Sequence, residues 1–242
     1  MRYIRQEKSA FLSKAFMVLL CLILCIRCCC VQVYGQGEVY RSVKTDSMKI
    51  AITFDDGPHP YLTEEILEIL QQYHVNATFF MVGCNVCNYP EVARAVIRAG
   101  HEVGNHTFSH RLFHHLHEDV IKDELGKCED ALEELCEYRP HLFRPPQGIL
   151  TPYVEQCSLE EDYTLILWSL DTRDWEVKNA KAISQCVLTQ VQPGDIILMH
   201  DYIGRGSQTP DALRSIIPAL LERGFEFVTV SELLGHEKVH PA

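Results

Sequence analysis

The residues best suited to catalysis or metal binding are two adjacent aspartates, Asp55 and Asp56, and two histidines, His106 and His110. Neighbouring carboxylates repel each other unless a positive charge lies beside them, and a divalent metal is the natural candidate. If the segment from His106 to His110 forms a helical turn, both imidazoles lie on one face. Two histidines and one carboxylate leave coordination positions open, which is typical of a catalytic metal site. The spacing alone does not single out this pair, because His110 and His114 are also four residues apart.

The elements that must position these residues follow from the hydrophobic pattern. Short apolar runs alternate with amphipathic stretches, which predicts about seven β-α units and a parallel sheet, either a barrel or a doubly wound fold. We expect strands at 49–54, 77–82, 101–104, 142–143, 163–170, 195–199 and 225–230. We expect helices at 63–73, with Thr63 as the cap, and at 91–99, 118–136, 180–191 and 210–223.

Polar residues follow the carboxyl ends of these expected strands. They are Asp55-Asp56, Asn105-His106, Arg144, the segment Asp171 to Trp175, and His200-Asp201. In a parallel barrel, the loops at the carboxyl ends converge on one edge, where catalytic groups gather. The pattern therefore predicts one site built from several strands, rather than scattered polar loops.

Composition excludes some classes of function. The formal net charge is -11 at pH 7, which argues against a basic surface that binds nucleic acid. No glycine-rich phosphate loop follows any expected strand, so no motif supports nucleotide binding.

The N-terminal region indicates export. Basic residues open the chain, and the apolar run 16–26 follows, closed by Arg27. A membrane-spanning helix needs about 20 apolar residues, so this run resembles a signal peptide cut near Gly35. The alternative is a retained anchor that attaches the chain to the membrane through residues 16–33. We therefore divide the chain into 1–35 (signal peptide or anchor), 36–47 (short linker), 48–235 (catalytic domain) and 236–242 (tail), and expect it to be secreted or held on the outer face of the membrane.

The cysteines of the exported part permit disulfides without proving them. Cys84 and Cys87 form a Cys-x-x-Cys pair, which we interpret as a local disulfide or two inert thiols. Cys128 and Cys136 lie about 12 Å apart along an expected helix, too far to pair with each other.

Five ordered motifs resemble those of the polysaccharide deacetylases, the NodB-homology or carbohydrate esterase family 4 enzymes. They are Thr53-Phe54-Asp55-Asp56-Gly57, His106-Thr107-Phe108-Ser109-His110, Arg144-Pro145-Pro146-Gln147-Gly148, Asp171-Thr172-Arg173-Asp174-Trp175 and Leu198-Met199-His200. The resemblance covers residues 48 to 234. It implies a distorted (β/α) barrel and metal-dependent removal of N-acetyl groups from an amino-sugar polymer such as peptidoglycan or a chitin-like glycan of the cell wall.

The same resemblance assigns roles at the matching positions. It implies that Asp56, His106 and His110 hold the metal. Asp55 would be the general base that takes a proton from the attacking water, and Arg144 would steady it.

The later motifs supply the remaining roles. His200 would protonate the departing amine, and Asp174 would orient His200 and tune its charge. The backbone N–H of Gln147 would stabilise the oxyanion, although many family members have Tyr at this position, so sugar contacts are expected to differ. Trp175 and Leu198 would form the wall of the pocket for the acetyl methyl group.

Several alternatives remain open from the sequence. Two imidazoles and a carboxylate suit zinc, which we expect, but also cobalt or nickel. A non-catalytic, metal-containing barrel that binds glycan would carry the same ligands. A deacetylase or deformylase for a small amide inside the cell is a further rival, against which the export segment weighs.

Overall fold

The computed structural model describes residues 38–202 and 206–235. The expected export segment, residues 1–35, and the expected tail, residues 236–242, lie outside the described residues. In the two described ranges, no helix is both long enough and apolar enough to cross a membrane.

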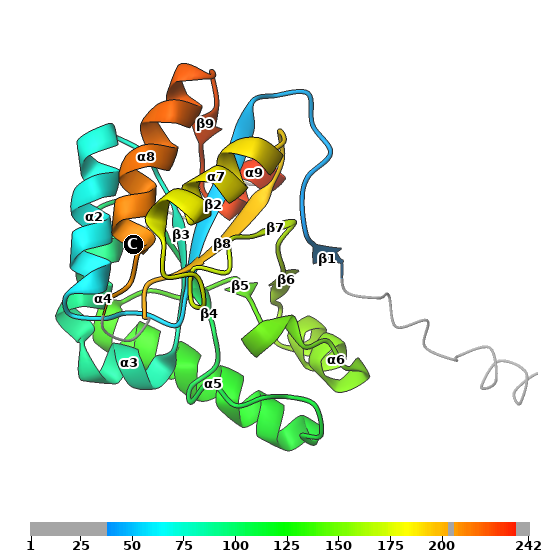
Figure 1. Ribbon diagram of the computed structural model, residues 1–242. Coiled ribbons are helices and arrows are strands. Elements are labelled where there is room, and N and C mark those ends of the chain that lie inside the picture. Colours follow the sequence, from blue (N-terminus) through cyan, green and yellow to red (C-terminus); the bar gives the residue numbers. More distant parts are fainter. Residues whose placement is uncertain (1–37, 203–205, 236–242) are drawn as a thin grey trace, which may run out of the picture. The chain divides into compact units, whose positions relative to one another are not determined.

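One parallel sheet forms the centre of the fold (Figure 1). Its strand order is β1-β6-β5-β4-β3-β2-β8-β7, and β9 pairs with the start of β2. The strands are β1 (Val39–Tyr40), β2 (Lys49–Asp55), β3 (Thr78–Met81), β4 (Glu102–Asn105), β5 (Leu142–Phe143), β6 (Thr164–Ile166), β7 (Leu170–Asp171), β8 (Ile196–His200) and β9 (Glu226–Phe227). The segment 36–47, expected as a linker, thus contributes β1, which pairs with β6.

The apolar run 163–170, expected as a single strand, forms two strands that belong to different parts of the sheet. Leu167 N donates to Tyr40 O of β1 at 2.7 Å, whereas Ser169 N donates to Ile196 O of β8 at 3.0 Å. The chain therefore changes neighbours within a few residues, which places β6 beside β1 near one end of the strand order and β7 at the other end. The curled parallel sheet is the distorted (β/α) barrel that the motifs imply.

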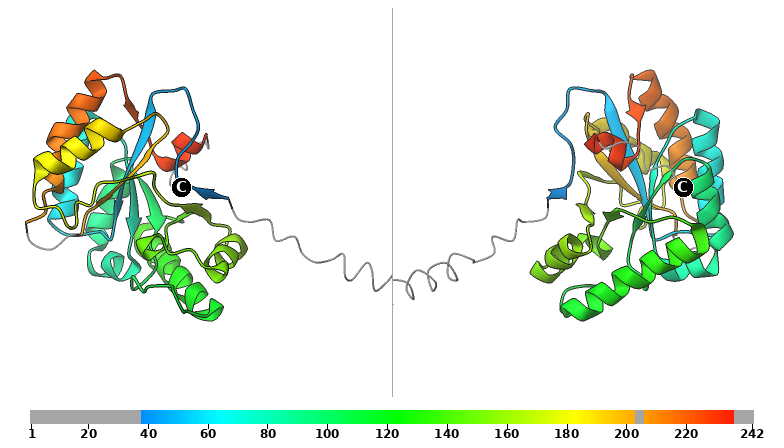
Figure 2. Two further views of the ribbon diagram at one scale, coloured as in Figure 1. Left: turned by 45° about the vertical axis from the view of Figure 1, so that its right-hand side comes forward. Right: turned by 180° about the vertical axis from the view of Figure 1, so that it is seen from behind.

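The helices pack around the sheet, and α2 and α8 lie side by side in both views (Figures 1 and 2). They are α2 (Leu62–Tyr73), α3 (Gly83–Asn88), α4 (Pro90–Arg98), α5 (Glu118–Cys136), α6 (Pro152–Glu160), α7 (Ala180–Gln190), α8 (Thr209–Glu222), α9 (Val230–Leu234) and the 3-10 turn η1 (Pro146–Gly148). The five expected helices are confirmed within a few residues. The helices α3, α6 and α9 were not predicted. α3 and α9 are too short for a clear helical period, and α6, although as long as α4, has only a weakly amphipathic sequence.

Alternation along β2 explains how the first motif reaches the site. Ile50, Ile52 and Phe54 belong to the apolar cluster between the sheet and the helices, whereas Ala51 belongs to a second cluster on the other face. Successive side chains of a strand point to opposite faces, so Asp55 shares the face of Ala51. The last residue of the strand therefore turns its carboxylate away from the helices.

Thr63 does not cap α2, contrary to our expectation. The N-cap is Tyr61, which has no side-chain capping bond. The Thr63 hydroxyl instead donates to Asp201 Oδ2 at 2.6 Å. A buried acceptor from the loop that follows β8 has therefore replaced the local capping bond.

All cysteines of the described residues are free thiols. Cys84 and Cys87 lie on α3, and Cys128 and Cys136 are buried on α5. Burial raises the pKa of Cys128 to about 12, so this thiol stays protonated and unreactive.

Candidate active site and metal centre

The carboxyl ends of the strands meet at a pocket of about 630 Å³. Eight of the ten residues to which the resemblance assigns roles line it: Asp55, Asp56, His106, His110, Gln147, Trp175, Leu198 and His200. Arg144 and Asp174 lie buried behind them, bonded to Asp55 and His200. Trp168, Asp171 and Tyr202 also line the pocket, and no sequence pattern singles out Trp168 or Tyr202.

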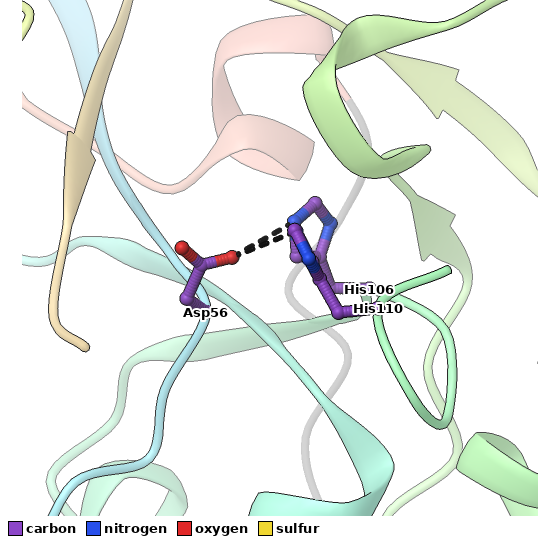
Figure 3. Close-up of side chains that lie close together, drawn as sticks. All are labelled: Asp56, His106 and His110. Atoms are coloured by element: carbon purple, nitrogen blue, oxygen red, sulfur yellow. Dashed lines mark ion pairs between the residues drawn. The ribbon is translucent and has the colours of Figure 1, made fainter. Parts of the chain in front are cut away.

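Asp56, His106 and His110 form a group that could hold a metal ion (Figure 3). Asp56 Oδ1 lies 3.4 Å from His106 Nε2 and 3.1 Å from His110 Nε2, and one donor atom from each residue lies within 4.8 Å of the others. Burial opposes the ionisation of Asp56, but the two imidazoles nevertheless hold its pKa well below the usual value. His114 is exposed and is not part of this group, which resolves the ambiguity in the spacing.

The hydrogen bond of His106 shows that the donor set fits a cation. Its Nδ1 lies 2.7 Å from Arg144 O, which can only accept, so Nδ1 carries the proton. The Nε2 of a neutral ring then presents its lone pair towards Asp56 Oδ1, a buried oxygen that accepts no hydrogen bond from residues 38–202 or 206–235. Metal-binding histidines typically donate their other ring N–H to a carbonyl or carboxylate in this way. Two histidines and a carboxylate with facing lone pairs fit a divalent transition metal.

The segment from His106 to His110 is a loop and not the helical turn that we expected. Thr107 and His110 have left-handed backbone angles, with φ of 70° and 54°. The imidazoles still meet, with ring centroids 5.1 Å apart, because buried groups hold the loop. Glu124 of α5 accepts hydrogen bonds from Ser109 N at 2.8 Å and Ser109 Oγ at 2.7 Å. The position of Glu124 among the apolar residues of the helix predicted at 118–136 is the sequence feature that could have indicated its hydrogen bonds to the loop.

Arg144 anchors Asp55 inside the barrel. Its Nη1 donates to Asp55 Oδ1 and to Thr53 Oγ1, both at 2.7 Å, and Nη2 donates to Leu167 O at 2.9 Å. The guanidinium is fully buried and lies 4.0 Å from the centroid of the Phe80 ring. A buried charge is stable only when it is paired and fully hydrogen-bonded, and Arg144 meets both conditions. The arrangement fixes one oxygen of Asp55 and leaves the other facing the pocket.

A second carboxylate and histidine pair lies across the pocket. His200 Nδ1 lies 2.8 Å from Asp174 Oδ1, and Asp174 Oδ2 accepts from His200 N at 2.9 Å and Thr209 Oγ1 at 2.7 Å. Burial alone would lower the pKa of His200, but the hydrogen bond to Asp174 and the charges of Asp174, Asp55 and Asp56 raise it to about 9. His200 is therefore held protonated at neutral pH.

Gln147 has the backbone arrangement expected of a hydrogen-bond donor to a ligand. Its φ of 56° is left-handed, and within the described ranges its N–H donates no hydrogen bond. Asp56, Thr107, His110 and Arg173, all in motif loops, also have positive φ. Such backbone strain costs of order 1–3 kcal/mol per residue and tends to cluster at functional sites.

The two apolar residues expected to form the methyl pocket differ in exposure. Leu198 is buried on β8, whereas Trp175 is 50% exposed at the pocket. This exposure shows that the Trp175 ring is not part of the hydrophobic core. Asp171 Oδ1 accepts a hydrogen bond from Arg173 N at 2.9 Å, so this carboxylate stabilises its own loop.

Asp201 was named only as a polar residue at a strand end, but it holds the turn that carries Asp56. Its fully buried carboxylate accepts from Gly57 N at 2.9 Å, and its own N–H donates to Asp55 O at 3.1 Å. A Cβ on Gly57 would collide with this carboxylate. Asn85 Nδ2 adds a bond to Asp56 O at 2.7 Å. The left-handed Asp56 backbone is thus held on both sides.

Replacing Asp201 by Ala is expected to weaken metal binding by about 10- to 100-fold, because supporting residues of metal ligands typically contribute that much. Asp201→Asn keeps an acceptor for Gly57 N and is expected to retain most of the affinity. Competition with a chromogenic chelator measures both variants. Equal affinity of Asp201→Ala and the wild type would contradict this positioning role.

The chain belongs to the polysaccharide deacetylase family, because residues 42–166 match the family model. It is 38% identical over 203 residues to a peptidoglycan-N-acetylglucosamine deacetylase of Bacillus cereus, covering 83% of this chain and 95% of that protein. Members of this family are hydrolases, and their deacetylation depends on a metal.

Solved structures agree with this assignment. The Bc1960 peptidoglycan N-acetylglucosamine deacetylase superposes with a TM-score of 0.78 at 35% identity, covering 82% of this chain and 93% of that chain. BA3943 from Bacillus anthracis, a CE4 family pseudoenzyme, superposes with a TM-score of 0.77 at 29% identity, covering 84% of this chain and 71% of that chain. The fold is therefore shared by active and inactive members, and only the site can distinguish them.

Proposed function

We propose that this protein removes N-acetyl groups from N-acetylglucosamine residues of a wall glycan of the peptidoglycan type. The observation that carries the proposal is that three sets of residues meet at one pocket. They are Asp56, His106 and His110, which we call the metal group; Asp55 with Arg144; and His200 with Asp174. The substrate class follows the relatives, which are peptidoglycan-N-acetylglucosamine deacetylases.

The metal would be held by Asp56, His106 and His110, and we propose zinc, with cobalt and nickel as ions that the same ligands accept. When bound, such an ion supplies Lewis acidity, which polarises an acetamide carbonyl and makes water a stronger acid. The remaining steps belong to the side chains of the chain itself.

Asp55 acts as the general base in this proposal. Arg144 donates a hydrogen bond to Oδ1 of Asp55, while Oδ2 of Asp55 lies 3.8 Å from His106 Nε2, beside the metal group. Asp55 therefore stands where it can take a proton from a water that attacks the acetyl carbonyl. Because the guanidinium is locked by its other hydrogen bonds, the carboxylate has a fixed orientation and little freedom to turn away.

His200 acts as the general acid. Asp174 engages Nδ1 and fixes the ring, so Nε2 is the nitrogen left to donate a proton to the departing amine. The N–H of Gln147, which donates to no group in the described part of the chain, is suited to stabilise the negative oxygen that develops on the carbonyl. Leu198 and Trp175 offer the apolar surface that an acetyl methyl group requires.

The pH dependence of kcat/KM tests the role of His200. Activity should be present below the pKa of His200 and be lost as the pH rises through that pKa, which is about 9 without metal. A bound cation would repel the imidazolium and lower this pKa. In Asp174→Asn the loss should begin nearer 6.5, the ordinary pKa of histidine, because the carboxylate that raises the pKa is gone. An alkaline limb that does not move in this variant would contradict the assignment.

We infer that the protein acts outside the cytoplasmic membrane. The basic start and the apolar run 16–26 support export, and a peptidoglycan substrate lies outside the membrane. N-terminal sequencing of the mature protein distinguishes cleavage near Gly35 from an anchor retained through residues 16–33.

A non-catalytic glycan-binding role has one observation in its favour, namely that a relative of this fold is a pseudoenzyme. Against it, the two residues that would move protons, Asp55 and His200, are both present with bonded partners. The deciding experiment incubates the zinc-loaded chain with N-acetylglucosamine oligomers and with peptidoglycan. Acetate and free amine released in equal amounts support deacetylation, whereas glycan binding without acetate would support the rival.

A further inference from the structure

A surface of aromatic side chains continues outward from the pocket. Tyr202, which lines the pocket, meets His59 edge to face, with ring centroids 5.0 Å apart at an interplanar angle of 84°. His59 in turn lies 5.9 Å from the Tyr61 ring. Tyr202 is 40% exposed and Tyr61 is 78% exposed. We name the side chains of Tyr61, His59 and Tyr202 the aromatic ledge.

The central ring of the aromatic ledge is fixed in place. His59 Nδ1 accepts hydrogen bonds from Leu62 N at 3.1 Å and from Tyr61 N at 3.3 Å. Partial burial lowers the pKa of His59, which favours the neutral ring that these bonds require. A ring held in this way offers a preorganised contact surface and loses little entropy on binding.

The aromatic ledge is not explained by packing. Single exposed aromatic residues are ordinary on protein surfaces, but here three rings touch in sequence and the innermost one borders the pocket. Tyr61 makes no side-chain cap to α2, so its side chain is not needed to begin that helix. Such a surface indicates a ligand that extends beyond the pocket.

The chemistry of the aromatic ledge suits sugar rings. A pyranose has a face of C–H groups with partial positive charge, which complements the negative face of an aromatic ring. Its hydroxyl groups lie at the ring edge, where tyrosine hydroxyls can form hydrogen bonds. We propose that the aromatic ledge binds further sugar residues of the N-acetylated glycan whose acetyl group occupies the pocket. This inference rests on the proposed function, and it predicts a preference for long chains.

The test measures the KM of the full-length wild type and of its Tyr61→Ala variant for N-acetylglucosamine oligomers of two and of five sugars. The wild type is expected to have a lower KM for the longer oligomer. Removing the Tyr61 ring should raise the KM for five sugars by between about twofold and tenfold, the range that one aromatic contact supports. The KM for two sugars should rise less, so the preference for length shrinks. Tyr202→Leu, which keeps an apolar side chain without the aromatic ring, should also raise the KM for five sugars more than the KM for two sugars.

Tyr153→Ala is the matched control. Tyr153 is 43% exposed on α6 and its ring contacts His117, with centroids 5.5 Å apart, outside the pocket lining. Its replacement should leave the preference for length as in the wild type. A wild type without this preference, or a Tyr61→Ala variant that retains it in full, would overturn the proposal.

Failure of the proposed function is separable from failure of the aromatic ledge. If the zinc-loaded wild type releases no acetate, the proposed reaction is wrong. Isothermal titration calorimetry with the same oligomers then decides on the aromatic ledge alone. Tighter binding of five sugars that is lost in Tyr61→Ala supports it, and equal binding by both proteins overturns it.

Discussion

Asp55→Asn is expected to lower kcat/KM by about 10²- to 10⁴-fold, the range that general-base catalysis contributes. The amide keeps the shape of the side chain and an oxygen for Arg144 Nη1, but it cannot take a proton. Metal affinity should remain near the wild-type value, because Asp56, His106 and His110 are unchanged. Acetate release and bound metal, measured on the same preparation, separate these two effects.

The stability of Asp55→Asn must be measured beside its activity. The change leaves the fully buried guanidinium of Arg144 without its negative partner, and breaking such a pair costs about 3–5 kcal/mol. Asp195→Asn is the control for the loss of a carboxylate far from the site, and it should keep wild-type activity. Asp195 precedes β8, at the opposite end of that strand from His200, and accepts a hydrogen bond from Ser169 Oγ at 2.7 Å. A folded Asp55→Asn variant with wild-type turnover would refute the role of base.

His106→Ala is expected to lower metal affinity by more than about 100-fold, because even the supporting residues of metal ligands contribute 10- to 100-fold. Activity should fall with metal content, and excess zinc should restore only part of it. The measurement is metal content after dialysis, together with the dissociation constant from chelator competition.

His114→Ala is the control for this prediction. His114 has the same spacing from His110 but is exposed and lies apart from the metal group. Its replacement should leave metal affinity unchanged. Loss of metal in His114→Ala with retention in His106→Ala would mean that His114, and not His106, holds the metal.

The sequence predicted the meeting of distant residues better than it predicted their local geometry. Parallel strands bring their carboxyl ends to one edge, so the sequence alone predicts that Asp55, Arg144 and His200 lie together. The joint position of His106 and His110 was also correct, but our reason was wrong. A helical turn was expected, whereas the segment is a strained loop held by Glu124.

The supporting interactions could not be predicted because they depend on contacts between distant segments. Asp201 reaches Gly57 and Thr63 across 144 and 138 residues of sequence. No local period marks such a contact, and Thr63 read alone has the pattern of a helix cap. The break between β6 and β7 has the same origin, because the identity of the neighbouring strands decides it and not the apolar run.

The most direct test of the metal-dependent site is a metal titration of acetate release. The full chain is stripped with a chelator, zinc is returned in steps, and acetate release from N-acetylglucosamine oligomers is followed at each step. We expect activity to vanish on stripping and to return in proportion to zinc until a single equivalent is bound. Turnover by protein verified to be metal-free, or a fully loaded protein that binds the oligomers and releases no acetate, would contradict the account.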